Sequence, residues 1–116
     1  MKINIVNLDK DGWILTKFAK NMFLHLKKKK VAVSLSKKPK YDVDVNHYII
    51  FLFLEEFRDY FPKNTINTTM LTHVNDEIRY NKIRNTAKFL NAGVAMSKHH
   101  AKFIESKKLG LKKIFH

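Results

Sequence analysis

Thr68 to Asp76, with the sequence Thr-Thr-Met-Leu-Thr-His-Val-Asn-Asp, is the stretch that decides how the rest of this chain is interpreted. Its first part is β-prone, and a polar cluster of His73, Asn75 and Asp76 follows at once. A helical pattern begins directly after this cluster. The stretch predicts a strand that ends in reactive side chains at the start of a helix. Ligands of open α/β sheets bind beyond the carboxyl ends of the strands, so we expect His73 to lie there with residues from other strand ends.

The composition describes one folded domain. A chain of 116 residues with 45% hydrophobic and 12% aromatic residues can bury a core of its own. Cysteine is absent, which excludes disulfides and thiolate metal sites and suits a cytoplasmic protein.

No secretory signal is expected at the N-terminus. The apolar run from 48 to 54 is far shorter than the roughly 20 residues of a membrane-spanning helix. We therefore expect a cytoplasmic protein, with peripheral contact at the inner face of the cell membrane as a further option.

The formal net charge is +13, from 23 basic and 10 acidic side chains. Such a charge favours polyanionic partners, namely nucleic acid, anionic lipid or phosphorylated substrates. Nearly all of the excess is lysine, and arginine occurs only at positions 58, 79 and 84. Lysine is a point charge, whereas the planar arginine side chain reads bases and phosphates bidentately. We interpret the charge first as a generic basic surface, with a dedicated anionic partner as the alternative.

Strand patterns alternate with helical patterns along the chain. Apolar residues at 15, 18, 19, 22, 23 and 26 repeat with the helical period, and lysines 27 to 30 complement the carboxyl end of that helix. The segment 49–60 is ambiguous, because its start is continuously apolar and its end is helical in pattern, and a short helix is predicted there. Further helices are predicted at 76–90 and 97–109, and strands at 2–7, 31–35, 41–48, 68–72, 93–96 and 111–115. This order predicts a single α/β domain over residues 1–116, a Rossmann-like parallel sheet with helices on both faces.

In such a sheet, polar residues from four strand ends are expected to share one cleft. They are Asp9, Asp11 and Gly12 after the first strand, Asn46 and His47 at the third, His73 and Asp76 at the fourth, and Ser97 with Lys98 at the fifth. We identify His73 as the catalytic candidate, because an imidazole at a strand end has no role in folding and can exchange protons near neutrality.

A structural interpretation remains open for most of the other candidates. Gly12 fits a loop glycine, and Asp76 and Ser97 fit helix N-caps. His47 fits a half-buried structural histidine. His99 and His100 lie within a predicted helix and are expected to be surface residues.

Several familiar sites are excluded by their motifs. No Gly-x-Gly-x-x-Gly follows the first strand, and the chain has no phosphate-binding Gly-x-x-x-x-Gly-Lys-Ser/Thr loop. The zinc motif His-Glu-x-x-His is absent too, and no metal site is predicted. A phospho-acceptor receiver domain is excluded because its third strand would end in an aspartate where Asn46 and His47 stand.

With its residues in this order, the chain resembles the N-terminal half of a GT-B glycosyltransferase, of the family-4-like kind found in bacterial surface-polysaccharide pathways. The matching segments are Asp44 to Ile49, Thr69 to Asp76, and Ala95 to Ser97 opening a helix that ends at Leu109 and Gly110. The resemblance implies two Rossmann-like domains facing across a cleft. The N-terminal domain would hold the sugar acceptor, and the missing C-terminal domain would bind the nucleotide-sugar donor.

The resemblance also implies roles for individual residues. The loop of Asp11, Gly12 and Trp13 is similar to the segment that approaches the donor phosphates. His73 is similar to the strand-end histidine that faces the transferred sugar and the acceptor, and Ser97 matches a strand-end serine. Asn46, His47 and Asp76 would complete the substrate-binding edge. No cofactor is implied other than the nucleotide-sugar of the full-length enzyme.

The length implies that the chain alone is incompetent in catalysis, because the donor-binding half would supply the groups that stabilise the leaving diphosphate. The functional expectation is thus the acceptor-binding domain of a hexosyltransferase-like enzyme that glycosylates a polysaccharide, lipid-linked or similar acceptor. The alternative is a basic α/β module that binds nucleic acid with little sequence preference. A third option is a structural or regulatory Rossmann-like domain without chemistry.

Overall fold

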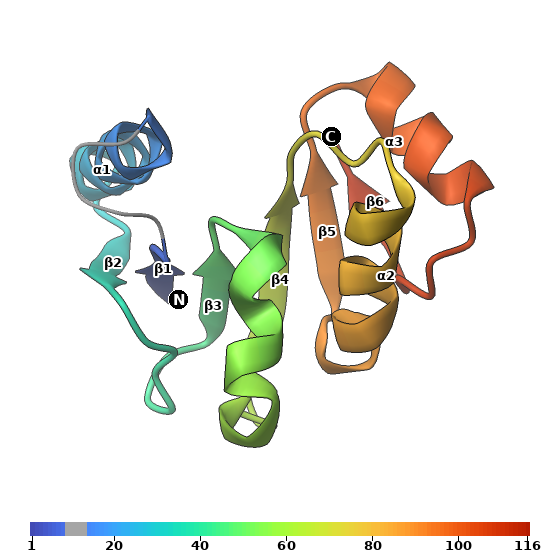
Figure 1. Cartoon of the computed structure of the whole chain (residues 1–116). Coiled ribbons are helices and arrows are strands. Elements are labelled where there is room, and N and C mark those ends of the chain that lie inside the picture. The colour runs from blue at the N-terminus through green and yellow to red at the C-terminus, as the bar shows by residue number, and fades with distance from the viewer. Residues whose placement is uncertain (9–13) are drawn as a thin grey trace.

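The computed structural model describes residues 1–8 and 14–116 of the chain. Its strands form one six-stranded sheet in the order β2-β1-β3-β4-β5-β6, and every neighbouring pair is parallel (Figure 1). The strands are β1 (Lys2–Val6), β2 (Ala32–Ser36), β3 (Val45–Tyr48), β4 (Ile66–Leu71), β5 (Ala92–Ala95) and β6 (Ile114–Phe115). The predicted α/β class with a Rossmann-like parallel sheet is confirmed.

The connections contain the expected helices, with shifted ends. They are α1 (Ile14–Lys28), the 3-10 helix η1 (Phe51–Tyr60), α2 (Glu77–Thr86), the short 3-10 helix η2 (Ala87–Phe89) and α3 (Lys98–Ser106). The predicted strand over 41–48 begins only at Val45, and the last strand is reduced to two residues. Residues 87–90 do not continue the predicted α-helix, because the chain tightens into η2 before it enters β5.

The strand order determines which helix covers which face. The connection from β1 to β2 runs along the sheet in the opposite direction to the connections from β3 through to β6. Because such crossovers are right-handed, α1 lies on one face, and η1, α2 and α3 lie on the other. The alternation of side chains along each strand produces two hydrophobic clusters, one on each side of the sheet.

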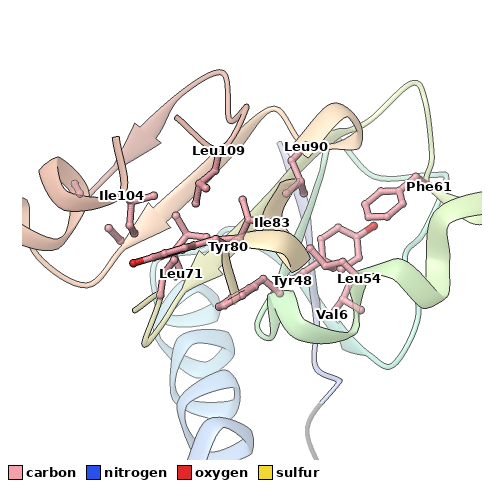
Figure 2. Close-up of a cluster of buried hydrophobic side chains, with 14 residues drawn as sticks. Val6, Tyr48, Leu54, Phe61, Leu71, Tyr80, Ile83, Leu90, Ile104 and Leu109 are labelled. Atoms are coloured by element: carbon pink, nitrogen blue, oxygen red, sulfur yellow. The ribbon is translucent and has the colours of Figure 1, made fainter. Parts of the chain in front are cut away.

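The larger cluster lies beneath η1, α2 and α3 (Figure 2). Leu71 from β4, Ile83 from α2 and Ile104 from α3 are all at most 1% exposed within it. The ring of Tyr48 packs against Phe61 at a centroid distance of 5.2 Å, and Phe61 stacks on Phe89 at the same distance. This cluster therefore joins the middle of the sheet to three separate connections.

The smaller cluster lies between α1 and the sheet. Ala19 of α1 and Ile5 of β1 are fully buried there, and partly buried side chains of α1 and β2 pack around them. Farther along the same face, Ile66 at the start of β4 and Phe115 of β6 are each 47% exposed. On this face, the described elements thus cover mainly one end of the sheet.

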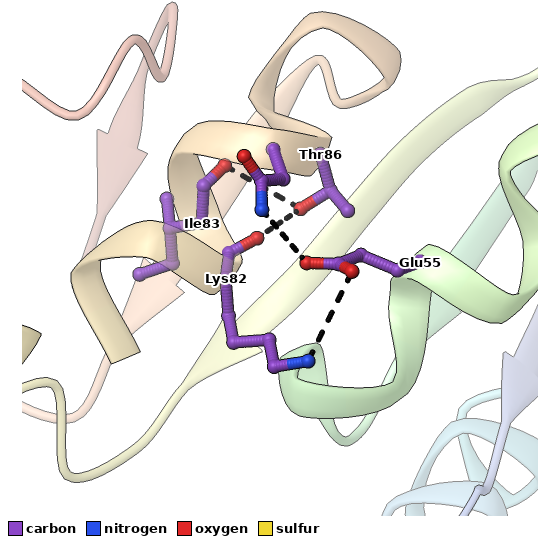
Figure 3. Close-up of polar contacts among 5 residues, drawn as sticks. Glu55, Lys82, Ile83 and Thr86 are labelled. Atoms are coloured by element: carbon purple, nitrogen blue, oxygen red, sulfur yellow. Dashed lines mark hydrogen bonds and ion pairs between the residues drawn. The ribbon is translucent and has the colours of Figure 1, made fainter. Parts of the chain in front are cut away.

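Polar contacts also join η1 to α2 (Figure 3). The Glu55 carboxylate accepts a hydrogen bond of 3.1 Å from Asn85 Nδ2 and lies 3.9 Å from Lys82 Nζ. In α2, the hydroxyl of Thr86 donates to the carbonyl of Lys82 at 3.0 Å. Partly exposed ion pairs contribute at most about 1 kcal/mol, so these contacts orient the two helices while the apolar cluster stabilises them.

We expect Leu71→Ala to lower the free energy of unfolding by about 2 to 5 kcal/mol, because the methyl groups that it removes lie in a closed core. Leu24→Ala is the matched control, since Leu24 on α1 is 58% exposed and its change should stay within about 0.5 kcal/mol. Urea unfolding followed by circular dichroism measures both. Equal losses in the two variants would contradict the assignment of the core.

Candidate functional site

The segment after β4 exposes His73 because its neighbours are buried. Leu71 and Val74 are both fully buried in the larger cluster, so the two residues between them must bulge away from it. His73 takes a backbone φ of +50°, in the left-handed region that non-glycine residues rarely adopt. That conformation costs about 1 kcal/mol, which the burial of two large apolar side chains offsets. The imidazole is thereby held outward at the end of β4.

The N-terminus of α3 lies beside this bulge. β5 pairs with β4 so that Ala95 is aligned with Leu71, and the two strands end at the same edge. Ser97 is the N-cap of α3, and its Oγ accepts a hydrogen bond of 3.1 Å from the backbone N–H of His100. The cap leaves other N–H groups of the first helical turn directed toward this edge, where they favour anionic or oxygen-rich ligands.

These two strand ends enclose a pocket of about 570 Å³. Its polar lining contains three imidazoles, a serine hydroxyl and an asparagine amide, and its apolar lining contains an aromatic ring and a methionine. The lining residues are Thr72, His73, Val74, Asn75, Met96, Ser97, His99, His100 and Phe103. None of them carries a carboxylate, so the pocket suits a hydroxylated or anionic ligand better than a cation.

The imidazoles of this pocket can donate and accept hydrogen bonds, as hydroxylated ligands require. In the described part of the chain, no group of three or more His, Asp or Glu side chains is arranged to hold a metal ion.

A larger hollow of about 660 Å³ lies at the opposite edge, near the amino ends of β4 and β5. Lys63, Lys88 and Lys112 line it together with the rings of Phe61 and Phe89. It has no histidine or carboxylate that could transfer a proton. We therefore assign the candidate site to the carboxyl edge, where the groups suited to chemistry are.

The structure brings two of the predicted site residues together in this pocket, His73 and Ser97. Asp76 lies nearby but is engaged as the N-cap of α2, where Oδ1 accepts from the backbone N–H of Arg79 at 2.9 Å. Its other oxygen pairs with the Arg79 guanidinium. Asp11, Gly12 and Trp13 fall outside the described residues.

Asn46 does not lie at the carboxyl edge, which corrects the sequence prediction. The strand begins at Val45, so Asn46 is its second residue and is fully buried. Its Oδ1 accepts from Asn4 Nδ2 at 3.0 Å and from the backbone N–H of Lys40 at 2.9 Å. Its Nδ2 donates to the Lys40 carbonyl at 2.8 Å and to Thr65 Oγ1 at 3.3 Å. The amide thus fastens the loop before β3 to the sheet.

We expect Asn46→Ala to lower the free energy of unfolding by about 2 to 4 kcal/mol, because it leaves several buried donors and acceptors without partners. Asn21→Ala on the exposed side of α1 serves as the control and should change stability by less than about 0.5 kcal/mol. Chemical denaturation compares the two. An Asn46→Ala protein as stable as the control would show that the buried network contributes little.

His47 lies on the other face of the sheet from Asn46 and also fails to reach the pocket. Its Nδ1 is 2.8 Å from the hydroxyl of Thr68, and Ile5 is its neighbour across β1. Burial lowers the pKa of His47 from 6.5 to about 4, so the ring is neutral at pH 7. Its ring thus lies within the sheet and not in the pocket at the carboxyl edge.

The lowered pKa makes stability depend on pH. The unfolded chain binds a proton at His47 below about pH 6.5, whereas the folded chain binds it only near pH 4, so stability falls as the pH falls through that window. We expect His47→Gln to reduce this loss, by up to about 3 kcal/mol at pH 4. Unfolding free energies between pH 7 and pH 4 measure it, with exposed His25→Gln as the control. Parallel pH profiles for wild type and His47→Gln would refute the prediction.

Two residues of the pocket were expected only to be surface residues. His99 and His100 are exposed and partly exposed, respectively, yet both line the pocket. Their position in the first turn after the cap at Ser97 was the available signal, because that turn begins at the carboxyl end of a strand. Phe103, one turn farther along, supplies the aromatic side of the pocket.

Comparison of the chain with protein-family models, with curated proteins and with solved structures gave no match.

Proposed function

We propose that this chain is the acceptor-binding domain of a glycosyltransferase that receives its nucleotide-sugar donor from a second α/β domain. The pocket between the ends of β4 and β5 is the observation that carries the proposal. It combines an outward imidazole at His73 with the capped end of α3 and an apolar side at Phe103. Sugars present hydroxyls around a ring with apolar faces, and such a lining complements both features.

In this proposal His73 orients the acceptor hydroxyl, or the transferred sugar, through its imidazole. Ser97 and the first turn of α3 hold further hydroxyl or phosphate oxygens, which the positive end of the helix favours. Phe103 and Met96 pack against the apolar face of the sugar ring. The diphosphate leaving group is stabilised by the donor-binding domain, and the reaction has no obligatory metal.

We expect His73→Ala to weaken the binding of an acceptor sugar by about tenfold, the loss of one or two hydrogen bonds in a partly desolvated pocket. Saturation-transfer NMR with a panel of methyl hexopyranosides on the isolated chain identifies a ligand, and titration gives its Kd. His25→Ala, an exposed histidine of α1, is the matched control.

Two results would contradict the proposal. One is a panel in which no methyl hexopyranoside binds at millimolar concentration. The other is binding that His73→Ala and Phe103→Ala both leave unchanged, because the sugar would then occupy another part of the surface. Amide shifts that move at residues 96–103 on titration would support the assigned pocket.

A further inference from the structure

Positive charge is high at both ends of the chain, and α1 lies in the N-terminal one. Residues 1–40 contain eleven lysines and two aspartates, so they carry a formal charge of +9 out of the total of +13. Helix α1 belongs to this part and contains four lysines and one histidine but no acidic residue. All four of its lysines are exposed, and Lys29 and Lys30 follow directly. The exposed surface of α1 is therefore strongly positive.

The outward side of α1 is also unusually apolar. Ile14 is 80% exposed, Leu24 is 58% exposed and Phe18 is 40% exposed. At about 100° per residue, Ile14 and Leu24 lie on the side of the helix opposite the fully buried Ala19. Phe18 lies about 100° from Ala19, at the margin of that side. Lys17 and Lys28 lie between Ile14 and Leu24, and Lys20 lies at the other margin of the same side. Single exposed apolar residues are common, but three of them interleaved with lysines on one helix form a defined surface, the outward face of α1.

We infer that the outward face of α1 binds the surface of an anionic lipid bilayer. Lysines attract anionic headgroups, and leucine, isoleucine and phenylalanine at headgroup depth leave water for the acyl boundary. A nucleic acid would satisfy the charges but leave the apolar side chains in water, and α1 contains no arginine to read its phosphates or bases. The contact is peripheral, since no described helix is long and apolar enough to cross a membrane.

The position of α1 makes such docking compatible with an open pocket. In Figure 1, α1 lies next to β1 and β2 at one end of the sheet, where it covers one face, and α3 lies at the other end beside β5 and β6. A bilayer on the outward face of α1 thus leaves the pocket at α3 accessible. The inference rests on α1 alone and does not depend on the proposed function.

The test is co-sedimentation of the chain with sucrose-loaded vesicles of phosphatidylcholine, with and without 30 mol% phosphatidylglycerol. Binding is expected only to the anionic vesicles. Each lysine at such a surface contributes roughly a factor of five, so Lys17→Gln, Lys20→Gln and Lys28→Gln together should lower the partition coefficient about a hundredfold. The control combines Lys63→Gln, Lys102→Gln and Lys112→Gln, which removes equal charge from exposed positions elsewhere, and should have a much smaller effect.

A second pair of variants separates insertion from charge. Ile14→Ser should weaken vesicle binding about tenfold, because an apolar side chain no longer enters the interface. Ile78→Ser is the matched control, since Ile78 on α2 is 72% exposed, and it should bind like the wild type. Thermal unfolding checks that all variants fold, which is expected because every changed side chain lies at the surface.

Two outcomes would overturn the inference. In one, the two triple-lysine variants bind anionic vesicles equally, so that binding follows net charge alone. In the other, a single-stranded oligonucleotide binds wild type and Ile14→Ser equally well in a salt-dependent manner while vesicles do not bind. The surface would then be a nucleic-acid interface.

Discussion

All six strands run in the same direction, and the rest of the structure depends on this constraint. A parallel pair cannot be closed by a tight hairpin, so each connection must cross a face of the sheet. The reversal of strand order at β1 then separates α1 from the other helices and divides the core into two clusters. The same constraint delivers the ends of β4 and β5 to one edge. His73 and Ser97 share a pocket because the segments that follow parallel strands all leave the sheet at the same edge.

The fold class could be predicted because side chains that become buried must recur at regular spacings along the sequence. The helical period of α1 and the alternation of strands with helices both reflect which side chains are removed from water. Polar residues follow no such rule, and Asn46 illustrates why: an extended loop and a strand look alike in sequence, so the start at Val45 was missed by four residues. His73 could be placed because it closes the β-prone run that contains Met70 and Leu71. The contribution of His99 depends on the exact start of α3, which a sequence pattern locates only to within a few residues.

A polar interior at one end of the sheet complements the apolar clusters. Asn4 on β1 accepts hydrogen bonds of 2.9 Å from the hydroxyls of Ser34 and Ser36 on β2, and donates to Asn46 on β3. Among the described residues, no buried side-chain nitrogen or oxygen lacks a partner. Apolar contacts tolerate small shifts between strands, whereas a slip of one residue would turn these amides and hydroxyls to the other face. The network therefore specifies the alignment of β1, β2 and β3, and β1 is the strand at which the order reverses.

The lysines that flank the two edge strands have a further consequence. β2 forms one edge of the sheet and β6 the other, and each leaves backbone groups open to pairing with a second molecule. Lysines precede and follow β2, and Lys112 and Lys113 precede the two residues of β6. A second chain adding edge to edge would bring its own flanking lysines close to those of the first chain. The composition that makes this protein basic thus also opposes its growth into intermolecular sheets, an effect that weakens as added salt screens the lysines.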